Sequence, residues 1–371
     1  MWFPPACEEG SKGLVQSGVL IDKTTIMTKA PDHQNPAKSP KPASITAVAR
    51  HAGVSIATVS RIMNGIVNKS SPATQLRVKA AVEELGYRPV THGQSLRRGE
   101  SRVVSIHAVN LANPTMAAIA ASAETALREA GYTMVLCDTH DQPDLQDTTL
   151  LDMRAHLVRG YVLLGTIDSA QLAQFQNHRE ALLYVNRRPH GATSTPDDFV
   201  GIDNKAAGAA VATYFKQRGL HHCGLIHGSL HSPATSDRVD GYTGTLSETG
   251  QGLNPRHIFA GQGLNHLQIG YDGITDLLQK GALPDALFCS SDLIAYGAHR
   301  KLSELGIQVP RDIVLMGFDD NPLNDWIAPW LNSVSVPYPK FGQAIVTGLE
   351  AIWNRGDRGA QILPFTIVER A

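Results

Sequence analysis

The stretch VARHAGVSIATVSRIMNG, residues 48–65, holds two short amphipathic runs on either side of a glycine. Apolar residues of the first run recur at the i, i+3, i+4, i+7 spacing of one helix face: Ile45, Val48, Ala49 and Ala52. Gly53 lets the chain turn sharply, and Ser55 is suited to cap a second helix. The outward face of that helix is mostly small or polar: Ile56, Ala57, Thr58, Ser60, Arg61 and Asn64. The pattern predicts two short helices, the second of which presents a face to a partner.

The flanking segments set the limits of this unit. A third helix is predicted from Ser71-Pro72 to Gly86, because serine caps a helix, proline suits its first position and glycine ends it. Residues 1–43 contain six prolines and no sustained periodicity, so we expect a disordered tail there.

Charge is distributed unevenly along the 371 residues. Residues 38–100 contain ten lysines and arginines against three glutamates, a net charge of +7, whereas the whole chain carries −1. A small basic module joined to a larger acidic one indicates nucleic acid as the partner of the first.

Beyond residue 101, short apolar runs such as VVSIHAV (103–109) alternate with helical patterns. This βαβα rhythm predicts parallel sheets with helices on both faces. The strands are too many for one ordinary sheet, so we expect two lobes with a ligand between them, at the carboxyl ends of the strands. We place the first lobe at about 101–198 plus 338–356 and the second at about 199–334 plus 358–371.

Several classes of protein have little support. The four cysteines form no CxxC pair, and the adjacent His221 and His222 would point to opposite faces of a strand, so we expect no disulfide framework and no metal site. The chain has no apolar run of membrane-spanning length and no secretory signal, so we expect a cytoplasmic protein that does not bind membranes. It has no GxSxG, P-loop or GxGxxG after a strand, so we expect no enzyme and no cofactor.

The quoted stretch, together with ATQLRVKAAVEELGYRP (73–89), resembles the DNA-binding head of the LacI/GalR family of regulators. Later motifs fit the same family: NPTM (113–116), SDLIAYGAHRKLSELGIQVP (291–310), GFDD (317–320) and LNSVSVP (331–337). The resemblance implies a helix-turn-helix head at 44–89 and a hinge helix at 90–100. It implies a two-lobed, periplasmic-binding-protein-like domain for effector binding and dimerisation at 101–371.

The resemblance also implies roles in DNA binding. The second helix enters the major groove, where the family reads bases with the positions occupied here by Ile56, Ala57 and Arg61. Arginine bonds guanine bidentately, and the hydroxyls of Ser55, Thr58 and Ser60 reach phosphates, with Asn64 on the same face. In the hinge, Leu96 takes the position of the leucine that is inserted into the minor groove and kinks the duplex.

For the effector, the resemblance implies contacts from residues at the edges of the cleft: Thr115, Met116, Asn186, Arg187, Arg238 and Asp292. Two arginines near one aspartate favour a hydroxylated ligand with a carboxylate, such as a sugar acid, because arginine binds carboxylates bidentately. A neutral sugar is the close alternative.

The expected mechanism is that of a homodimeric repressor on a palindromic operator, with a tetramer left open. Effector binding would change the angle between the lobes and so the spacing of the hinges. The sequence leaves open whether the effector releases DNA or strengthens its binding. The alternative function is that of a solute-binding protein of a sugar transport system, which would share the two lobes but not the basic head.

Overall fold

The computed structural model describes residues 43–66, 69–87, 101–189, 198–248, 250, 252–281, 283–354 and 359–370. The chain forms two compact units, Met1–Val90 and Thr91–Ala371. The expected tail before residue 43 and the hinge helix at 90–100, with Leu96, lie outside the described residues.

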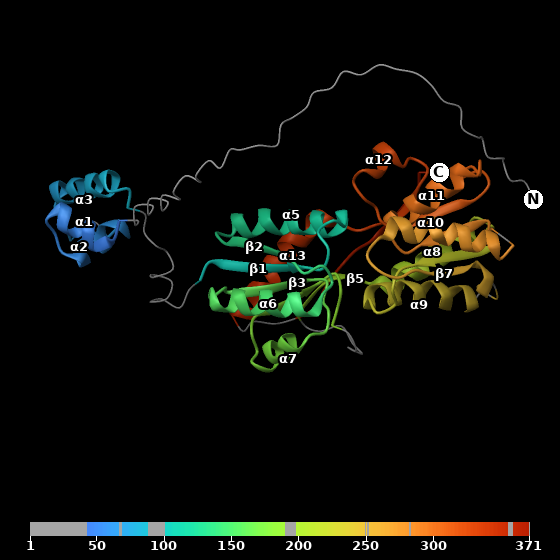
Figure 1. Cartoon of the computed structure of the whole chain (residues 1–371), viewed down its shortest axis with the longest axis horizontal. Helices are drawn as coiled ribbons and strands as arrows, with labels where there is room; N and C mark the ends of the chain where they lie inside the picture. The colour runs from blue at the N-terminus through green and yellow to red at the C-terminus, as the bar shows by residue number, and fades with distance from the viewer. Residues whose placement is uncertain are drawn as a thin grey trace, which may run out of the picture. The chain divides into compact units, whose positions relative to one another are not determined.

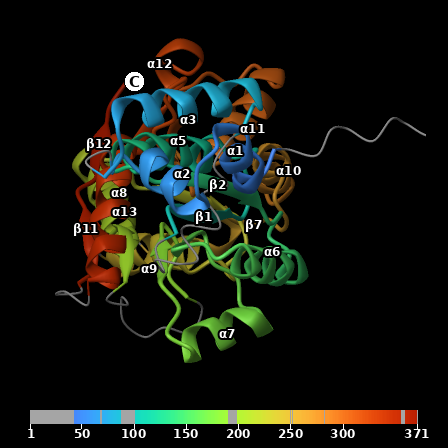
Figure 2. The ribbon, with the colours of Figure 1, turned by 90° about the vertical axis from the view of Figure 1, so that its left-hand side faces the viewer.

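The described part of the smaller unit contains three helices: α1 (Ile45–Ala52), α2 (Ile56–Met63) and α3 (Pro72–Glu84) (Figures 1 and 2). Each begins after a serine whose hydroxyl accepts a backbone N–H of the first turn: Ser44, Ser55 and Ser71. Gly53 adopts a left-handed conformation at the end of α1 and turns the chain into α2. The inner faces of the helices meet in a small core around Val48, Val59 and Val78.

In the larger unit, a first six-stranded sheet has the order β11-β5-β4-β3-β1-β2. Its strands are β1 (Val103–Ala108), β2 (Thr133–Asp138), β3 (Gly160–Leu164), β4 (Leu182–Val185), β5 (Phe199–Ile202) and β11 (Gln361–Leu363). The helices beside it are α5 (Pro114–Glu129), α6 (Pro143–Ala155), α7 (Ala170–Asn177) and α13 (Tyr338–Trp353). Helices α5 and α13 pack together on one face, and α6 and α7 cover the other.

The second sheet repeats this plan with the order β12-β10-β9-β8-β6-β7. Its strands are β6 (Cys223–His227), β7 (Ile258–Ala260), β8 (Ala286–Cys289), β9 (Val314–Asp319), β10 (Asn332–Ser335) and β12 (Thr366–Val368). Its helices are α8 (Asn204–Gln217), α9 (Pro233–Glu248), α10 (His266–Gln279), α11 (Asp292–Glu304) and α12 (Asn324–Ile327), with a 3-10 turn at Pro255–His257. The paired helices α8–α9 and α10–α11 are amphipathic covers for strands that are buried on both faces.

Strand pairing confirms two lobes with parallel sheets, in which β10–β12 is an antiparallel pair. The lobe boundaries from sequence are wrong at two places. Residues 199–202 were expected to open the second lobe, but β5 pairs with β4 in the first sheet. Residues 361–363 were also expected there, but β11 pairs with β5. Both differences have the same cause: the sequence of a short apolar strand does not indicate which sheet the strand joins.

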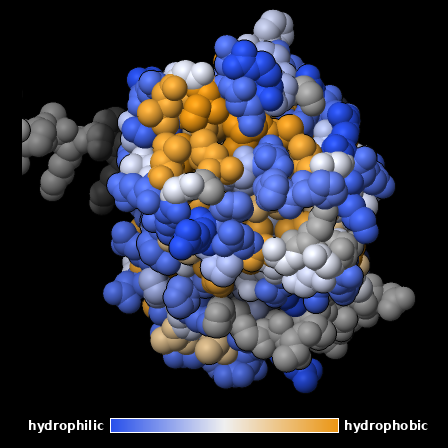
Figure 3. Space-filling view, turned by 90° about the vertical axis from the view of Figure 1, so that its right-hand side faces the viewer, coloured by the Kyte–Doolittle hydropathy of each residue, from blue (hydrophilic) through white to orange (hydrophobic). Residues whose placement is uncertain are grey.

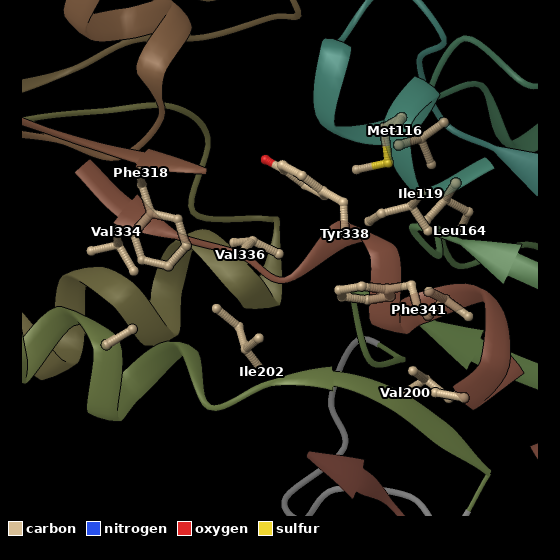
Figure 4. Packing of buried hydrophobic residues seen from close by; sticks show 14 of the residues in the cluster. Met116, Ile119, Leu164, Val200, Ile202, Phe318, Val334, Val336, Tyr338 and Phe341 are labelled. Carbon is tan, nitrogen blue, oxygen red and sulfur yellow. The ribbon is translucent and has the colours of Figure 1, made fainter. Parts of the chain in front are cut away.

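The chain therefore passes between the lobes three times: after β5, after β10 and between β11 and β12. Figure 4 shows the packing at these passages, with Phe318 and Val334 in the second lobe, Phe341 in α13, and Ile202 and Val336 between them. The apolar core is thus continuous across the passages, which positions the two lobes against each other.

Candidate functional site

Helix α2 presents the surface predicted to read DNA. The hydroxyl of Ser55 accepts the backbone N–H of Thr58 at 3.2 Å and lies 2.9 Å from the Thr58 hydroxyl. This cap fixes the first turn of the helix, and Val59 and Ile62 then face the core of the head. The remaining positions are left on the outside.

The structure gathers the predicted DNA-binding residues of the head on this one helix and its ends. Ile56 is 47% exposed, and Ser55, Ala57, Arg61 and Asn64 are exposed as well. Thr58 and Ser60 are half-buried, and the Asn64 amide donates to the Ser60 carbonyl at 2.7 Å. The result is a face with the exposed apolar side chains of Ile56 and Ala57 and the cationic side chain of Arg61, which suits the major groove.

A cavity of about 300 Å³ lies between the two lobes of the larger unit. The first lobe contributes residues that follow β2, β3 and β4 in loops or at the start of a helix: Asp141, Pro143, Thr166, Ile167, Asp168 and Arg187. The second lobe contributes residues that follow β6 and β7 in the same way: Ser229, His231, Ser232, Thr235, Gly263, Leu264 and His266. The cavity therefore lies at the carboxyl ends of both sheets, where the sequence predicted it.

Arg187 is the predicted effector residue that lines this cavity. Its guanidinium donates to Asp141 at 3.2 Å and to the Thr166 carbonyl at 3.5 Å. Both partners belong to the first lobe, so the charge of Arg187 is balanced on its own side of the cleft.

Arg238 is 7% exposed and lies within the second lobe. Its Nε donates to Asn204 Oδ1 and its Nη1 to the Ser290 carbonyl, both at 2.8 Å. Nη1 also lies 3.8 Å from the carboxylate of Asp319, and the guanidinium stacks over Phe318. Burial lowers the pKa of Arg238, and Asp319 opposes that effect. Burial raises the pKa of Asp319 to about 6 although Arg238 lowers it.

Asp292 begins α11 and is almost fully buried. Its Oδ1 accepts the Ser333 hydroxyl at 2.6 Å, and its Oδ2 accepts the Asn321 N–H at 2.7 Å and the Asn324 amide at 2.8 Å. Burial and the nearby Asp319 raise its pKa to about 7. The carboxylate is thus part of a network that joins α11, β10 and the loop after β9.

The remaining predicted effector residues do not line this cavity. Thr115 is buried, with its hydroxyl 3.4 Å from that of Tyr338, which donates to the Asp319 carbonyl at 2.6 Å. Met116 packs in the core of the first lobe. Asn186 has a left-handed backbone and lines a second cavity of about 220 Å³. Of the six predicted residues, Arg187 alone therefore lines the larger cavity in the described structure.

His266 is a cavity residue that the sequence analysis missed. Its Nδ1 lies 3.0 Å from the hydroxyl of Ser291, the cap of α11. Burial, followed by Arg238 and Arg187, lowers its pKa to about 4. The imidazole is therefore neutral at neutral pH. The signal that could have found it is its position at the start of the helix after β7, a strand whose carboxyl end faces the cleft.

Residues 44–90 match the family model of bacterial regulatory proteins, lacI family, and residues 212–371 match that of a periplasmic binding protein-like domain. The HTH-type transcriptional repressor PurR of Aliivibrio salmonicida is 30% identical over 306 residues, which cover 82% of this chain and 90% of the relative. PurR of Photorhabdus laumondii is 29% identical over 303 residues, with coverage of 81% and 87%.

Solved structures show the same architecture. The lac repressor bound to ONPG in its repressed state superposes with a TM-score of 0.78 at 23% identity, covering 89% of this chain and 99% of that one. The complex of the transcriptional regulator CelR with cellobiose gives 0.65 at 25% identity, covering 88% and 99%.

The family model and the relatives identify a DNA-binding transcriptional repressor with an effector-binding domain, and not an enzyme. The chain belongs to the LacI family of bacterial regulatory proteins. The matching head removes the support for the alternative of a solute-binding transport protein.

Within the described residues, no helix is both long and apolar enough to cross a membrane.

Proposed function

We propose that this repressor acts in the cytoplasm as a homodimer on a palindromic operator and responds to a small carbohydrate-like effector bound between its lobes. The observation that carries the effector part is the 300 Å³ cavity, because both lobes line it with hydroxyl, carboxylate, guanidinium and imidazole groups. A cavity of this size and polarity suits a ligand with many hydroxyl groups.

On DNA, Arg61 would read a guanine, and Ile56 and Ala57 would read thymine methyl groups or exclude other bases. Ser55, Thr58 and Ser60 would contact phosphates and set the register of the helix. Asn64 would lie beside them at the end of the helix. Leu96 would enter the minor groove between the two half-sites.

The pairing of charges bears on the type of effector. Arg187 is bonded to Asp141, and Arg238 lies beside Asp319. Both guanidinium groups that would hold a sugar acid thus already lie beside a carboxylate. We therefore favour a neutral sugar, with the sugar acid as the alternative, which would have to displace a carboxylate from an arginine.

In either case, the effector acts through its different affinity for two lobe arrangements, and this difference limits how far it shifts operator binding. Arg238 and Asp292 would respond through the network of Asp319 and Tyr338, which reaches Thr115 in the first lobe. Asn186, Arg187 and Met116 would contribute from the first lobe when the cleft changes shape.

The proposed homodimer needs an apolar face on each copy. Leu136 is exposed on β2, an edge strand of the first sheet. In the second lobe, the exposed side chains include Leu278 and Leu305, and Figure 3 shows an apolar area on the surface at this end of the molecule. Such areas are typical of surfaces that bind another protein.

Calorimetry tests the effector. The full chain is titrated with neutral sugars including cellobiose, with sugar acids and with purines, and each hit is added to a gel-shift assay on DNA obtained by binding-site selection. We expect a neutral sugar to bind and to change DNA affinity. We expect Arg238→Ala to lose this response.

The matched control is Arg300→Ala, which removes an exposed arginine of the same lobe. Thermal unfolding of both variants shows whether each still folds. If only sugar acids bind, the effector is an acidic sugar and not a neutral one. Tight purine binding, or an unchanged affinity in a folded Arg238→Ala, would contradict the carbohydrate assignment.

A further inference from the structure

Arg188 and Asp237 join the two lobes by an ion pair. Arg188 follows β4 of the first sheet, and Asp237 lies in α9 of the second lobe. The Nη2–Oδ1 distance is 2.5 Å. The two side chains are 25% and 22% exposed, so water screens the pair less than a surface pair.

The surroundings make Asp237 dependent on Arg188. Burial raises the pKa of Asp237, as do the carboxylates of Asp240 and Asp203, whereas Arg188 lowers it. Lys205 also lines the 220 Å³ cavity beside the pair. Without Arg188, the carboxylate would remain partly buried next to two like charges.

The neighbouring arginine shows that this crossing is specific. Arg187 and Arg188 are adjacent in the sequence, yet Arg187 bonds Asp141 in its own lobe and Arg188 bonds the opposite lobe. A change in lobe angle would therefore break the second pair and leave the first intact.

The position of Asp237 places the pair next to Arg238, a predicted effector residue. It precedes Arg238 in α9, and α9 packs against α8 so closely that a Cβ on Gly241 would overlap the backbone carbonyl of Lys205. Helices α8 and α9 are thus in close backbone contact at this point. Displacement of Arg238 would be transmitted directly to Asp237.

We propose that Arg188 and Asp237 form a cross-lobe latch that holds the lobe angle of this structure and thereby positions Arg238. They are positioning residues that act through Arg238. The ion pair itself does not depend on the proposed function. Only its consequence, that the lobe angle controls the response to the effector, rests on that proposal.

Distances between spin labels test the latch without effector or operator. Labels are attached to Glu129→Cys in α5 and Gln279→Cys in α10, two exposed positions in different lobes, after Cys7 and Cys137 are replaced by serine. Electron–electron double resonance is then recorded for the labelled parent, Arg188→Gln, Asp237→Asn and the swap Arg188→Asp with Asp237→Arg. Arg154→Gln, which removes an ion pair with Glu180 inside the first lobe, is the matched control.

We expect Arg188→Gln and Asp237→Asn each to raise the population of a second lobe–lobe distance about tenfold, because each removes the ion pair between the lobes. The swap should restore the parent distribution, and Arg154→Gln should leave it unchanged. Unchanged distances in both single variants, a swap that restores nothing, or an equal shift in Arg154→Gln would each overturn the latch. Failure of the effector screen would leave these outcomes unaffected, so the two proposals fail separately.

Discussion

His107 makes the stability of the first lobe depend on pH. It lies in β1 and is 1% exposed, with Nδ1 3.1 Å from the Thr149 hydroxyl and Nε2 3.1 Å from the Ser105 hydroxyl. Burial lowers its pKa from 6.5 to about 4. The folded protein therefore holds the imidazole in its neutral form.

The sign and size of the effect follow from this pKa. Between pH 6.5 and 4 the unfolded chain binds the proton and the folded chain does not, so the free energy of unfolding falls as pH falls. The loss from this group is about 2 kcal/mol at about pH 5 and reaches about 3 kcal/mol well below pH 4. Asp292 and Asp319 act in the opposite direction, because their pKa values are raised in the folded state.

A variant separates these contributions. Urea unfolding of the parent and of His107→Gln is measured at about pH 7.5 and about pH 5. For each protein this gives the change in the free energy of unfolding between the two pH values, to which Asp292, Asp319 and His266 contribute equally in both proteins. We expect the parent to lose about 2 kcal/mol more than His107→Gln between the two values. Equal losses in both proteins would refute the assignment of a neutral, buried imidazole.

Three further predictions concern DNA reading, the buried network and helix packing. Arg61→Ala should cost about 1–3 kcal/mol of operator affinity and relax the preference at one base pair of each half-site, whereas Thr58→Ala should weaken binding to all DNA sequences alike. A binding-site selection in which Arg61→Ala keeps its base preference would contradict the base contact. Near pH 7, Asp292→Asn should lower the free energy of unfolding in urea by only about 1 kcal/mol, because the pKa of Asp292 is close to 7. Asp292→Ala should lower it by about 3–5 kcal/mol, because three donors lose their acceptor. Equal losses in the two variants would argue against the network. Gly241→Ala should destabilise the folded protein by about 1–3 kcal/mol, because its Cβ would clash with α8. Gly244→Ala in the same helix, where a Cβ meets nothing, should be neutral or slightly stabilising. Similar melting temperatures for the two variants would contradict the close packing.

The head could be read from the sequence because its deciding interactions are local. The caps of Ser44, Ser55 and Ser71 each reach a backbone N–H three residues ahead. The apolar spacing then fixes which side of α2 faces the core, and so which residues remain outside. The order of strands and helices in the larger unit was also predictable, because each short apolar run is buried on both faces.

The sequence by itself determined a capped recognition helix, a two-lobed parallel α/β domain and a polar site at the ends of its strands. The tertiary structure alone decided that β5 and β11 belong to the first sheet, that His266 lines the cleft, and that Arg187 and Arg188 have partners in different lobes. The physical reason is distance along the chain. Strand partners and ion pairs join residues tens of positions apart, and the local periodicity that predicts an element carries no information about which distant surface it will meet.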